Sequence, residues 1–477
     1  MSDTTVSPGF LGRTRGLLRR ALRDVIDSAT SIRGRSGLTV KPDLPDDDVS
    51  RLQQKIDASL SGRGGEASAR TNAADLGHCY LELSGTGRLR FLTLLNEHYG
   101  IEPSHLNDTI DAVRTATDDP MAYALALAKL RDDLVSPRMT LLRQFNGLKH
   151  GVKFLVNMRA DLREFVREHP ELTSLDAELK HLLSGWFDAG FLELRRITWG
   201  APADLLEKLI AYEAVHEIQS WADLKNRLES DRRFYAFFHP SMHDEPLIFV
   251  EVALVNGIAG NVQTLLDETA PIADPAAADT AIFYSISNAQ PGLSGVSFGD
   301  FLIKRVVDHL SRELPNINTF STLSPVPGFR RWLDRRLAYD AELLNHEQED
   351  ALDLVAGGRP DDSQALPWLL DQPHWHQDEQ IVSVLQPVLM HLVADYLLCQ
   401  RRESSGTALD SVAHFHLSNG AMVERINWLA DTSARGMQQS MGMMVNYLYD
   451  KARIETNHEA YVSGNEIPAS STVRNLL

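Results

Sequence analysis

Cysteine is scarce in this sequence. The 477 residues include only Cys79 and Cys399, which lie far apart along the chain. Two cysteines cannot form a disulfide framework or a cysteine-rich metal site, and such low usage is typical of a reducing, intracellular compartment. We therefore expect an intracellular protein whose fold does not depend on disulfide bonds.

Long apolar runs and an excess of basic residues are also absent. No run reaches the length of about 18 apolar residues that predicts a transmembrane helix. The net charge of −18 argues against general nucleic-acid binding, which needs a basic face. The apolar fraction of 43% is ordinary for a globular protein, and 477 residues are too many for one core. We expect two or three domains that neither cross a membrane nor bind nucleic acid.

The N-terminal segment, residues 1–74, is basic at its start and rich in turn-forming residues at its end. The arginine-rich start resembles a mitochondrial presequence, but Asp24 and Asp27 interrupt it and such peptides are poor in acidic residues. We favour a surface helix with a flexible start, and hence a cytoplasmic protein; a presequence would imply the mitochondrial matrix. Glycine, serine, aspartate and proline over residues 34–74 predict a linker with one short helix.

The spacing of apolar residues divides the rest of the chain in two. Over residues 75–188 they recur every three or four positions with almost no strand signal, which predicts an all-helical domain for oligomerisation or support. From residue 189 short β-like runs appear between turns and helical stretches, and they predict a mixed α/β domain over residues 189–477. The runs are RRFYAFFH, PLIFVEVALV, TAIFYSIS and INTFSTLS. The second is predicted to be a buried central strand.

A glycine-rich turn, residues Gln290–Asp300, follows the third of these strands and opens a helix. Glycines allow a phosphate to approach the backbone, and a helix N-terminus favours anions. The turn lacks the lysine of a Walker A loop and the spacing of a dinucleotide-binding fingerprint. It resembles the pyrophosphate-binding turn with which acetyltransferase-fold proteins grip coenzyme A. Glycines that serve only a tight turn are the alternative.

Ser324 lies at the end of the next predicted strand, in the run LSPVPGF. Pro325 and Pro327 restrict the backbone, and the residue before a proline avoids the helical region. An extended and fixed serine is therefore expected, with a purely structural turn as the alternative.

Two histidine pairs also stand out, His374 with His376 and His414 with His416. The first lies in a predicted loop, and the second in a predicted strand or loop before a turn at Asn419–Gly420. Two strand histidines on one face suit a metal, but no carboxylate or cysteine nearby completes a ligand set. We predict no metal site. A single histidine is well suited to proton transfer at neutral pH.

Several runs, in this order, resemble the malonyl-CoA decarboxylases: GLKHGVKFLVNMRADL, TAIFYSIS, QPGLSGVSFGDFLIKRVV, FSTLSPVPGFRRWL and FHLSNGAMVERINWLAD. The resemblance spans roughly residues 75–455 and both predicted domains. It implies a helical domain followed by a catalytic domain of the acetyltransferase (GNAT) fold, and a homotetramer built through the helical domains. The implied reaction converts malonyl-CoA to acetyl-CoA and CO2, in fatty acid metabolism, without a metal or other cofactor.

The resemblance also assigns site residues. The catalytic serine of the family falls on Ser324 and its catalytic histidine on His416, and both are expected to contact the substrate. Its coenzyme A contacts fall on seven consecutive residues, Ser294, Gly295, Val296, Ser297, Phe298, Gly299 and Asp300.

The chemistry of the reaction suggests a role for each of the two residues. Loss of CO2 leaves a thioester enolate, whose oxygen needs hydrogen-bond donors and whose carbon needs a proton. We expect His416, near the usual histidine pKa of about 6.5, to supply that proton. Ser324 is expected to orient the malonyl carboxylate and to exchange a proton with His416. A Ser-His-Asp acyl-enzyme is less favoured, because decarboxylation needs no covalent intermediate and no partner acid is evident. An acyltransferase and a non-catalytic acyl-CoA sensor are the rival functions.

Overall fold

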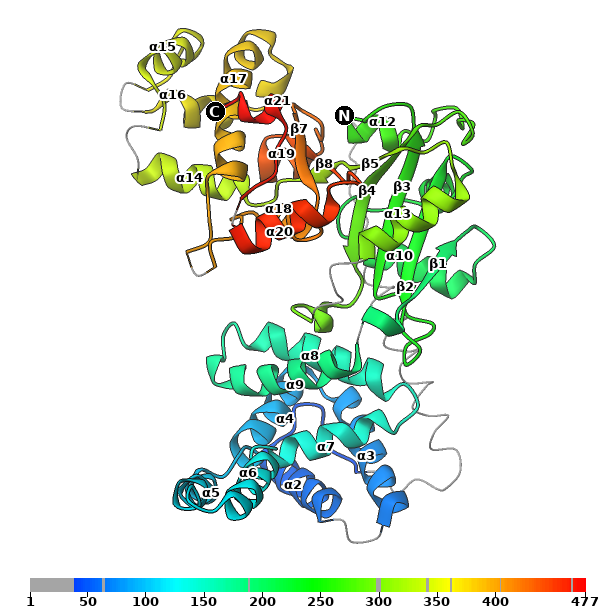
Figure 1. Cartoon of the computed structure of the whole chain (residues 1–477), viewed down its shortest axis with the longest axis vertical. Coiled ribbons are helices and arrows are strands. Elements are labelled where there is room, and N and C mark those ends of the chain that lie inside the picture. Colours follow the sequence, from blue (N-terminus) through cyan, green and yellow to red (C-terminus); the bar gives the residue numbers. More distant parts are fainter. Residues whose placement is uncertain are drawn as a thin grey trace.

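The computed structural model describes residues 38–61, 65–187, 189–296, 302–339, 343–360, 363–403, 405–464 and 466–477. Within them a helical domain is followed by a mixed α/β domain, as the sequence predicted (Figure 1). The N-terminal basic segment, and Ser297, Phe298, Gly299 and Asp300 of the glycine-rich turn, lie outside the described residues. Cys79 and Cys399 are both free thiols.

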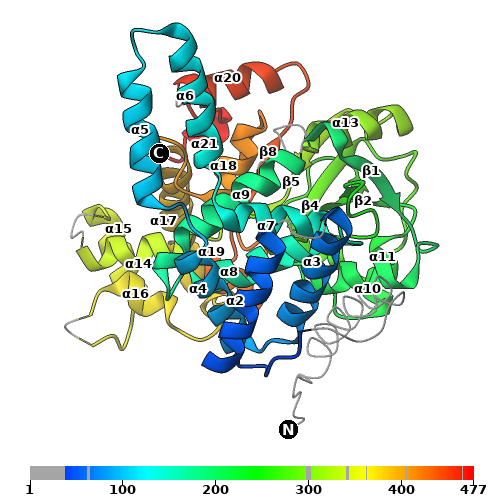
Figure 2. The same cartoon turned by 90° about the horizontal axis from the view of Figure 1, so that it is seen from below.

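The helical domain begins earlier than the sequence suggested. Two helices occupy much of the segment expected to be a linker. Leu52 and Ile56 lie four positions apart on one face of the first and are fully buried, while Asp46 and Asp47 stabilise its N-terminus. The helices of the domain are α2 (Asp46–Leu60), α3 (Gly65–Glu82), α4 (Gly85–His98), α5 (Pro103–Thr115), α6 (Pro120–Asp133), α7 (Pro137–Asn146), α8 (Gly151–Phe165), η1 (Pro170–Leu172) and α9 (Thr173–Trp186). The hairpin of α5 and α6 projects from the body of the molecule (Figure 2).

One sheet forms the centre of the second domain, with strand order β1-β2-β3-β4-β5-β8-β6 and with β7 paired to β8. The four predicted strands are confirmed as β2 to β5, and β3 is central and buried. Among the strands that the structure describes, β4 and β5 pair in parallel and the other strand pairings are antiparallel. The strands are β1 (Glu193–Ile197), β2 (Arg232–Phe238), β3 (Ile248–Val255), β4 (Thr280–Asn288), β5 (Thr319–Thr322), β6 (Ser324–Pro325), β7 (Met422–Asn427) and β8 (Met444–Leu448).

Helices pack around this sheet. The connection between the parallel strands β4 and β5 contains the glycine-rich turn and then α13, whose apolar face, including Val306 and Leu310, is buried. The helical elements are α10 (Ala203–Tyr212), α11 (Trp221–Arg227), α12 (Val262–Leu266), α13 (Leu302–Glu313), α14 (Phe329–Tyr339), α15 (His346–Val355), α16 (Ala365–Leu370), α17 (Glu379–Leu398), α18 (Ser411–Ser418), α19 (Ala434–Ser440), α20 (Ile454–Gly464) and α21 (Ser471–Arg474), with the short 3-10 turns η2 (Ala189–Phe191), η3 (Pro291–Leu293) and η4 (Trp375–Gln377).

Helix α17 is long and apolar enough to cross a membrane, by length and composition alone. It contains Pro387, and one side of it, including Leu389 and Val393, is buried in the protein core. This burial is characteristic of the core helix of a globular domain.

Candidate active site

Ser324 and His416 lie in direct contact although 92 positions separate them. Ser324 Oγ is 3.0 Å from His416 Nε2, and both side chains are buried. Ser324 begins β6, so its backbone is extended, as the prolines that follow it predicted. The contact joins one residue of the sheet to one residue of α18.

His416 lies on a helix, and the predicted strand or loop is wrong. Asp410 Oδ1 accepts the backbone N–H groups of Val412 and Ala413 and so caps the start of α18. Because residues two apart on a helix point in very different directions, His414 and His416 cannot form the paired metal ligands of a strand. Within the described parts of the chain, no three acidic, histidine or cysteine side chains form a metal-binding group. The predicted turn at Asn419–Gly420 ends the helix.

Asp410 also ties the histidine helix to the serine loop. Its second oxygen, Oδ2, accepts the N–H of Gly328 at 3.3 Å and the hydroxyl of Tyr396 at 3.2 Å. Gly328 follows Ser324 by four residues and leads into α14. One buried carboxylate therefore fixes the two chain segments that carry the site, and burial raises its pKa.

Two tyrosines that the sequence did not single out surround His416. The hydroxyl of Tyr449 lies 2.9 Å from His416 Nδ1, and the Tyr447 ring stacks on the imidazole with centroids 4.5 Å apart. Both tyrosines are fully buried. The Tyr447 hydroxyl has no hydrogen-bond partner among the residues that the structure describes. The imidazole is thus held at both nitrogens and on one face.

Burial keeps His416 uncharged. It lowers the pKa of the imidazole to about 3, so the expectation of a histidine near its ordinary pKa is wrong. Burial also raises the pKa of Tyr449 well above its ordinary value, so this hydroxyl keeps its proton. A neutral imidazole has one N–H, so one ring nitrogen donates and the other accepts.

The bond from Ser324 to the Thr322 hydroxyl determines the direction of the hydrogen bonds that His416 makes with Ser324 and Tyr449. Ser324 Oγ donates to Thr322 Oγ1 at 2.9 Å. Because the serine proton points at Thr322, Ser324 Oγ accepts from His416 Nε2–H, and Nδ1 accepts from Tyr449. The result is one line of donors running from Tyr449 through His416 to Ser324, assigned from the hydrogen-bond network.

The glycine-rich turn lies against α8 of the helical domain, which approaches it closely (Figure 1). A Cβ on Gly292 would lie 1.8 Å from the carbonyl oxygen of Val156, so only glycine allows this approach. Arg159 Nη1 donates to the carbonyl oxygens of Gly292, at 2.6 Å, and Ser294, at 3.0 Å. Gly295 has a φ of +76°, and its N–H has no partner among the described residues. Val296, the third described residue of the predicted coenzyme A contacts, is buried.

The parallel pairing of β4 and β5 brings the turn and the serine to one edge of the sheet. The turn follows the carboxyl end of β4, and Ser324 follows the carboxyl end of β5. Ligands of open α/β sheets bind in this position, beyond the carboxyl ends of neighbouring parallel strands. The pairing of β4 with β5 ends at Phe283 and Thr322. Beyond it, β4 continues to Asn288 without β5 beside it.

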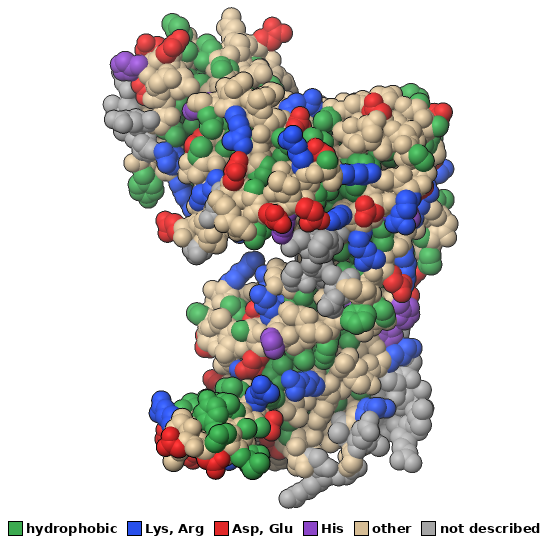
Figure 3. Space-filling view, viewed as in Figure 1, with side chains coloured by type: hydrophobic (Ala, Val, Ile, Leu, Met, Phe, Trp, Pro, Cys, Tyr) green, Lys and Arg blue, Asp and Glu red, His purple; other side chains and the backbone are tan. Residues whose placement is uncertain are grey.

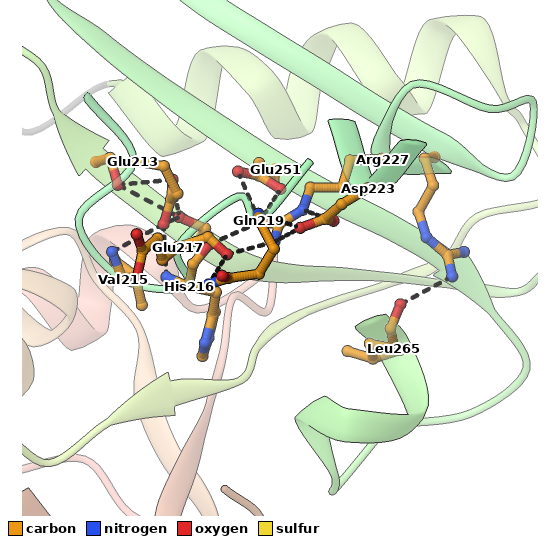
Figure 4. A network of polar contacts seen from close by, with 12 residues as sticks. Glu213, Val215, His216, Glu217, Gln219, Asp223, Arg227, Glu251 and Leu265 are labelled. Atoms are coloured by element: carbon orange, nitrogen blue, oxygen red, sulfur yellow. Dashed lines mark hydrogen bonds and ion pairs between the residues drawn. The ribbon is translucent and has the colours of Figure 1, made fainter. Parts of the chain in front are cut away.

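A separate buried cluster, shown in Figure 4, lies around Glu251 of β3. Arg227 donates from Nε to Asp223 Oδ1 at 2.7 Å and from Nη1 to Glu251 Oε2 at 3.2 Å. Glu213 accepts bonds from the hydroxyls of Ser285 and Ser287. Burial raises the pKa of Glu251 to about 8. We call this the charged cluster; it lies outside the Ser324–His416 contact.

Comparison with known protein families gives two matches. A model of the malonyl-CoA decarboxylase C-terminal domain matches residues 190–477, and a model of the malonyl-CoA decarboxylase N-terminal domain matches residues 99–187.

Individual proteins agree with these matches. The chain is 37% identical over 404 residues to a mitochondrial malonyl-CoA decarboxylase of Anser anser anser, covering 82% of this chain and 80% of that protein. It is 36% identical over 427 residues to that of Mus musculus, covering 86% of each. Among solved structures, malonyl-CoA decarboxylase from Rhodopseudomonas palustris matches with a TM-score of 0.82 and 43% identity, over 90% of this chain and 99% of that one. The enzyme from Agrobacterium vitis matches with a TM-score of 0.79 and 41% identity, over 89% and 99%.

Proposed function

The chain belongs to the malonyl-CoA decarboxylase family, and we propose that it decarboxylates malonyl-CoA at the contact between Ser324 and His416. The observation that carries this proposal is the 3.0 Å contact between Ser324 Oγ and His416 Nε2, at the sheet edge to which the glycine-rich turn also leads. As a decarboxylase it is a carboxy-lyase, producing acetyl-CoA and CO2.

The proposed reaction has two steps. The bond between the α-carbon and the carboxylate breaks, its electron pair passes into the thioester enolate, and CO2 leaves. A proton then forms the new C–H bond at the α-carbon. Overall the reaction consumes one proton, which the protein must deliver and then recover from solvent.

We assign proton delivery to His416, acting through Ser324. Both ring nitrogens of His416 are engaged, and Ser324 is the neighbour that faces Nε2. A malonyl carboxylate close to the buried imidazole raises its pKa, because an opposite charge favours the protonated form. The substrate itself thereby draws a proton onto His416. Ser324 orients the carboxylate and passes the proton on; an unassisted hydroxyl is too weak a base for any larger role.

Coenzyme A is proposed to lie along β4. Its pyrophosphate would meet the glycine-rich turn, where the N–H of Gly295 has no partner among the described residues. Its pantetheine would follow β4 beyond the end of β5 towards Ser324. We expect no metal and no cofactor apart from the coenzyme A of the substrate.

A direct assay tests this function. Purified protein mixed with malonyl-CoA, and with no acyl acceptor, is expected to release CO2 and acetyl-CoA in equal amounts, before and after exhaustive chelation. Release that stops on chelation and returns with added metal would contradict the metal-free mechanism. Transfer of the malonyl group to an amine or hydroxyl acceptor without CO2 release would instead favour an acyltransferase.

The helical domain is proposed to assemble the protein into a homotetramer. Apolar side chains on and just after α6 are strongly exposed in the single chain, among them Met121 at 75%, Leu125 at 68% and Leu134 at 52%. Figure 3 shows apolar side chains gathered at this end of the molecule. Patches of this kind mark surfaces between protein chains. Leu125→Glu should lower the mass measured by light scattering, whereas an unchanged tetramer would exclude this surface.

We propose a cytoplasmic role in fatty acid metabolism. The matched Anser and Mus proteins are named as mitochondrial. Fusion of residues 1–37 to a fluorescent protein separates the two locations: import into mitochondria would contradict the cytoplasmic proposal.

A further inference from the structure

A lysine of the helical domain lies on the glycine-rich turn. A Cβ placed on Gly295 would lie 3.4 Å from both Cε and Nζ of Lys180, so the end of this side chain is in contact with the turn. Lys180 belongs to α9, whereas Gly295 belongs to the α/β domain. The ammonium group therefore reaches across from one domain to the other.

Most cations around the turn already have partners. Arg159 is buried, pairs with Asp176 and binds two carbonyl oxygens of the turn, and Arg163 binds the carbonyl oxygen of Pro291. Lys153 donates to the side chain of Gln290. These three side chains fix the shape of the turn. Their charges are committed to protein oxygens.

Lys180 differs from these cations. Its ammonium group is exposed and makes no hydrogen bond or ion pair with any residue that the structure describes. Next to it, the N–H of Gly295 also lacks a partner in the described chain, and its φ of +76° sets it apart from the regular backbone. An unpaired cation beside an unpaired backbone N–H is a site for a phosphate oxygen.

We propose that Lys180 binds a phosphate group of the coenzyme A part of the substrate, so that the helical domain takes part in substrate recognition. This inference rests on the proposed place of coenzyme A at the glycine-rich turn. Lys180 touches no reacting atom, so it strengthens binding without a role in the loss of CO2.

The test compares three substrates that carry the same malonyl thioester: malonyl-CoA, malonyl-dephospho-CoA and malonyl-pantetheine. Lys180→Ala should raise KM for malonyl-CoA about tenfold, the loss of one charge-assisted contact, with kcat unchanged. The same variant should leave KM for malonyl-pantetheine unchanged, because that substrate has no nucleotide phosphates. Lys180→Arg should restore most of the affinity. Lys225→Ala is the matched control: it removes another exposed lysine, on α11, that has no partner among the described residues.

The outcomes separate this inference from the proposed function. If Lys180→Ala also raises KM for malonyl-dephospho-CoA, Lys180 contacts the pyrophosphate. If the increase in KM disappears with that substrate, Lys180 contacts the 3′-phosphate. Both results support the inference. An equal penalty with malonyl-pantetheine, or a KM like that of Lys225→Ala, would overturn it. If either of these two results is found while the wild-type protein decarboxylates malonyl-CoA, the Lys180 inference is wrong but the proposed function stands. Failure of the wild type to turn over malonyl-CoA would contradict the proposed function itself.

Discussion

The Ser324–His416 site and the charged cluster are both buried polar assemblies of the α/β domain, but they differ in charge. The site is a line of neutral groups, Tyr449, His416 and Ser324. The charged cluster joins Arg227 to the carboxylate of Asp223 and to Glu251, whose pKa burial raises to about 8, with Glu213 held by serine hydroxyls. Burial acts on both in the same sense, since it favours the uncharged form of each group.

The difference shows what each assembly is suited to do. Buried charges must be matched by partners, and the charged cluster uses its groups to connect the α10–α11 region to β3 and β4. The neutral site has an unused polar group: the buried Tyr447 hydroxyl has no hydrogen-bond partner in the described chain. A strongly shifted pKa therefore does not by itself identify the catalytic site of this protein.

Removing the cation of the charged cluster should have the largest effect. Arg227→Met leaves Asp223 and Glu251 without their partner and should cost about 3–5 kcal/mol of unfolding free energy. Denaturant unfolding measures this loss. The kcat of the protein that remains folded should stay near wild type, and a stability change below about 1 kcal/mol would show that the cluster is not structural.

The pH dependence of stability should have opposite signs in the two assemblies. The pKa of His416 falls from 6.5 in the unfolded chain to about 3, so its contribution is full above pH 6.5 and is lost as pH falls towards 3. At pH 5 the loss is roughly 2 kcal/mol, which His416→Gln should remove. The pKa of Glu251 is raised from 4.5 to about 8, so its contribution is lost as pH rises over that range.

Unfolding curves from pH 5 to 8 for wild type, His416→Gln and Glu251→Gln check both signs. Relative to wild type, His416→Gln should become more stable as pH falls, and Glu251→Gln should become more stable as pH rises. Parallel curves for all three proteins would contradict the burial argument.

Tyr449→Phe tests the outer end of the proton line. Loss of the hydroxyl leaves His416 Nδ1 unpaired and frees the imidazole to rotate, so kcat should fall about tenfold, or roughly 1.4 kcal/mol. KM should change little, because Tyr449 contacts Nδ1 of His416, whereas Ser324 contacts Nε2. A rise in KM without a fall in kcat would instead indicate that the Tyr449 hydroxyl contacts the substrate.

Tyr447→Phe should have the smallest effect on stability. The hydroxyl that it removes is buried without a partner in the described residues, so unfolding free energy should stay within about 0.5 kcal/mol or rise. The stacked ring remains in place. A loss above about 2 kcal/mol would show that the Tyr447 hydroxyl makes a stabilising hydrogen bond.

Local signals in the sequence predicted much of the fold. Strands β2 to β5, the glycine-rich turn before α13 and the extended backbone of Ser324 each depend on neighbouring residues, so short patterns suffice. Helix α18 also had its signals, because Asp410 is a good N-cap and Gly420 a good C-terminal stop. The aspartate-rich start of α2 was similarly mistaken for a linker.

Other features depend on residues that are distant in sequence. Tyr449 meets His416 only after the chain has folded, and nothing in the sequence near His416 marks it. The pKa of His416 depends on burial, which the sequence near it does not show. The contact of Lys180 with Gly295 requires two domains to dock.

The proposed roles of Ser324 and His416 can be measured through the kcat of Ser324→Ala and His416→Ala with malonyl-CoA, in preparations whose thermal unfolding is recorded in parallel. Removing a proton-transfer group costs about 10²–10⁴-fold in rate, so each variant should lose at least about 100-fold in kcat while remaining folded. Near-wild-type kcat in either folded variant would contradict the assignment of the reaction to this pair.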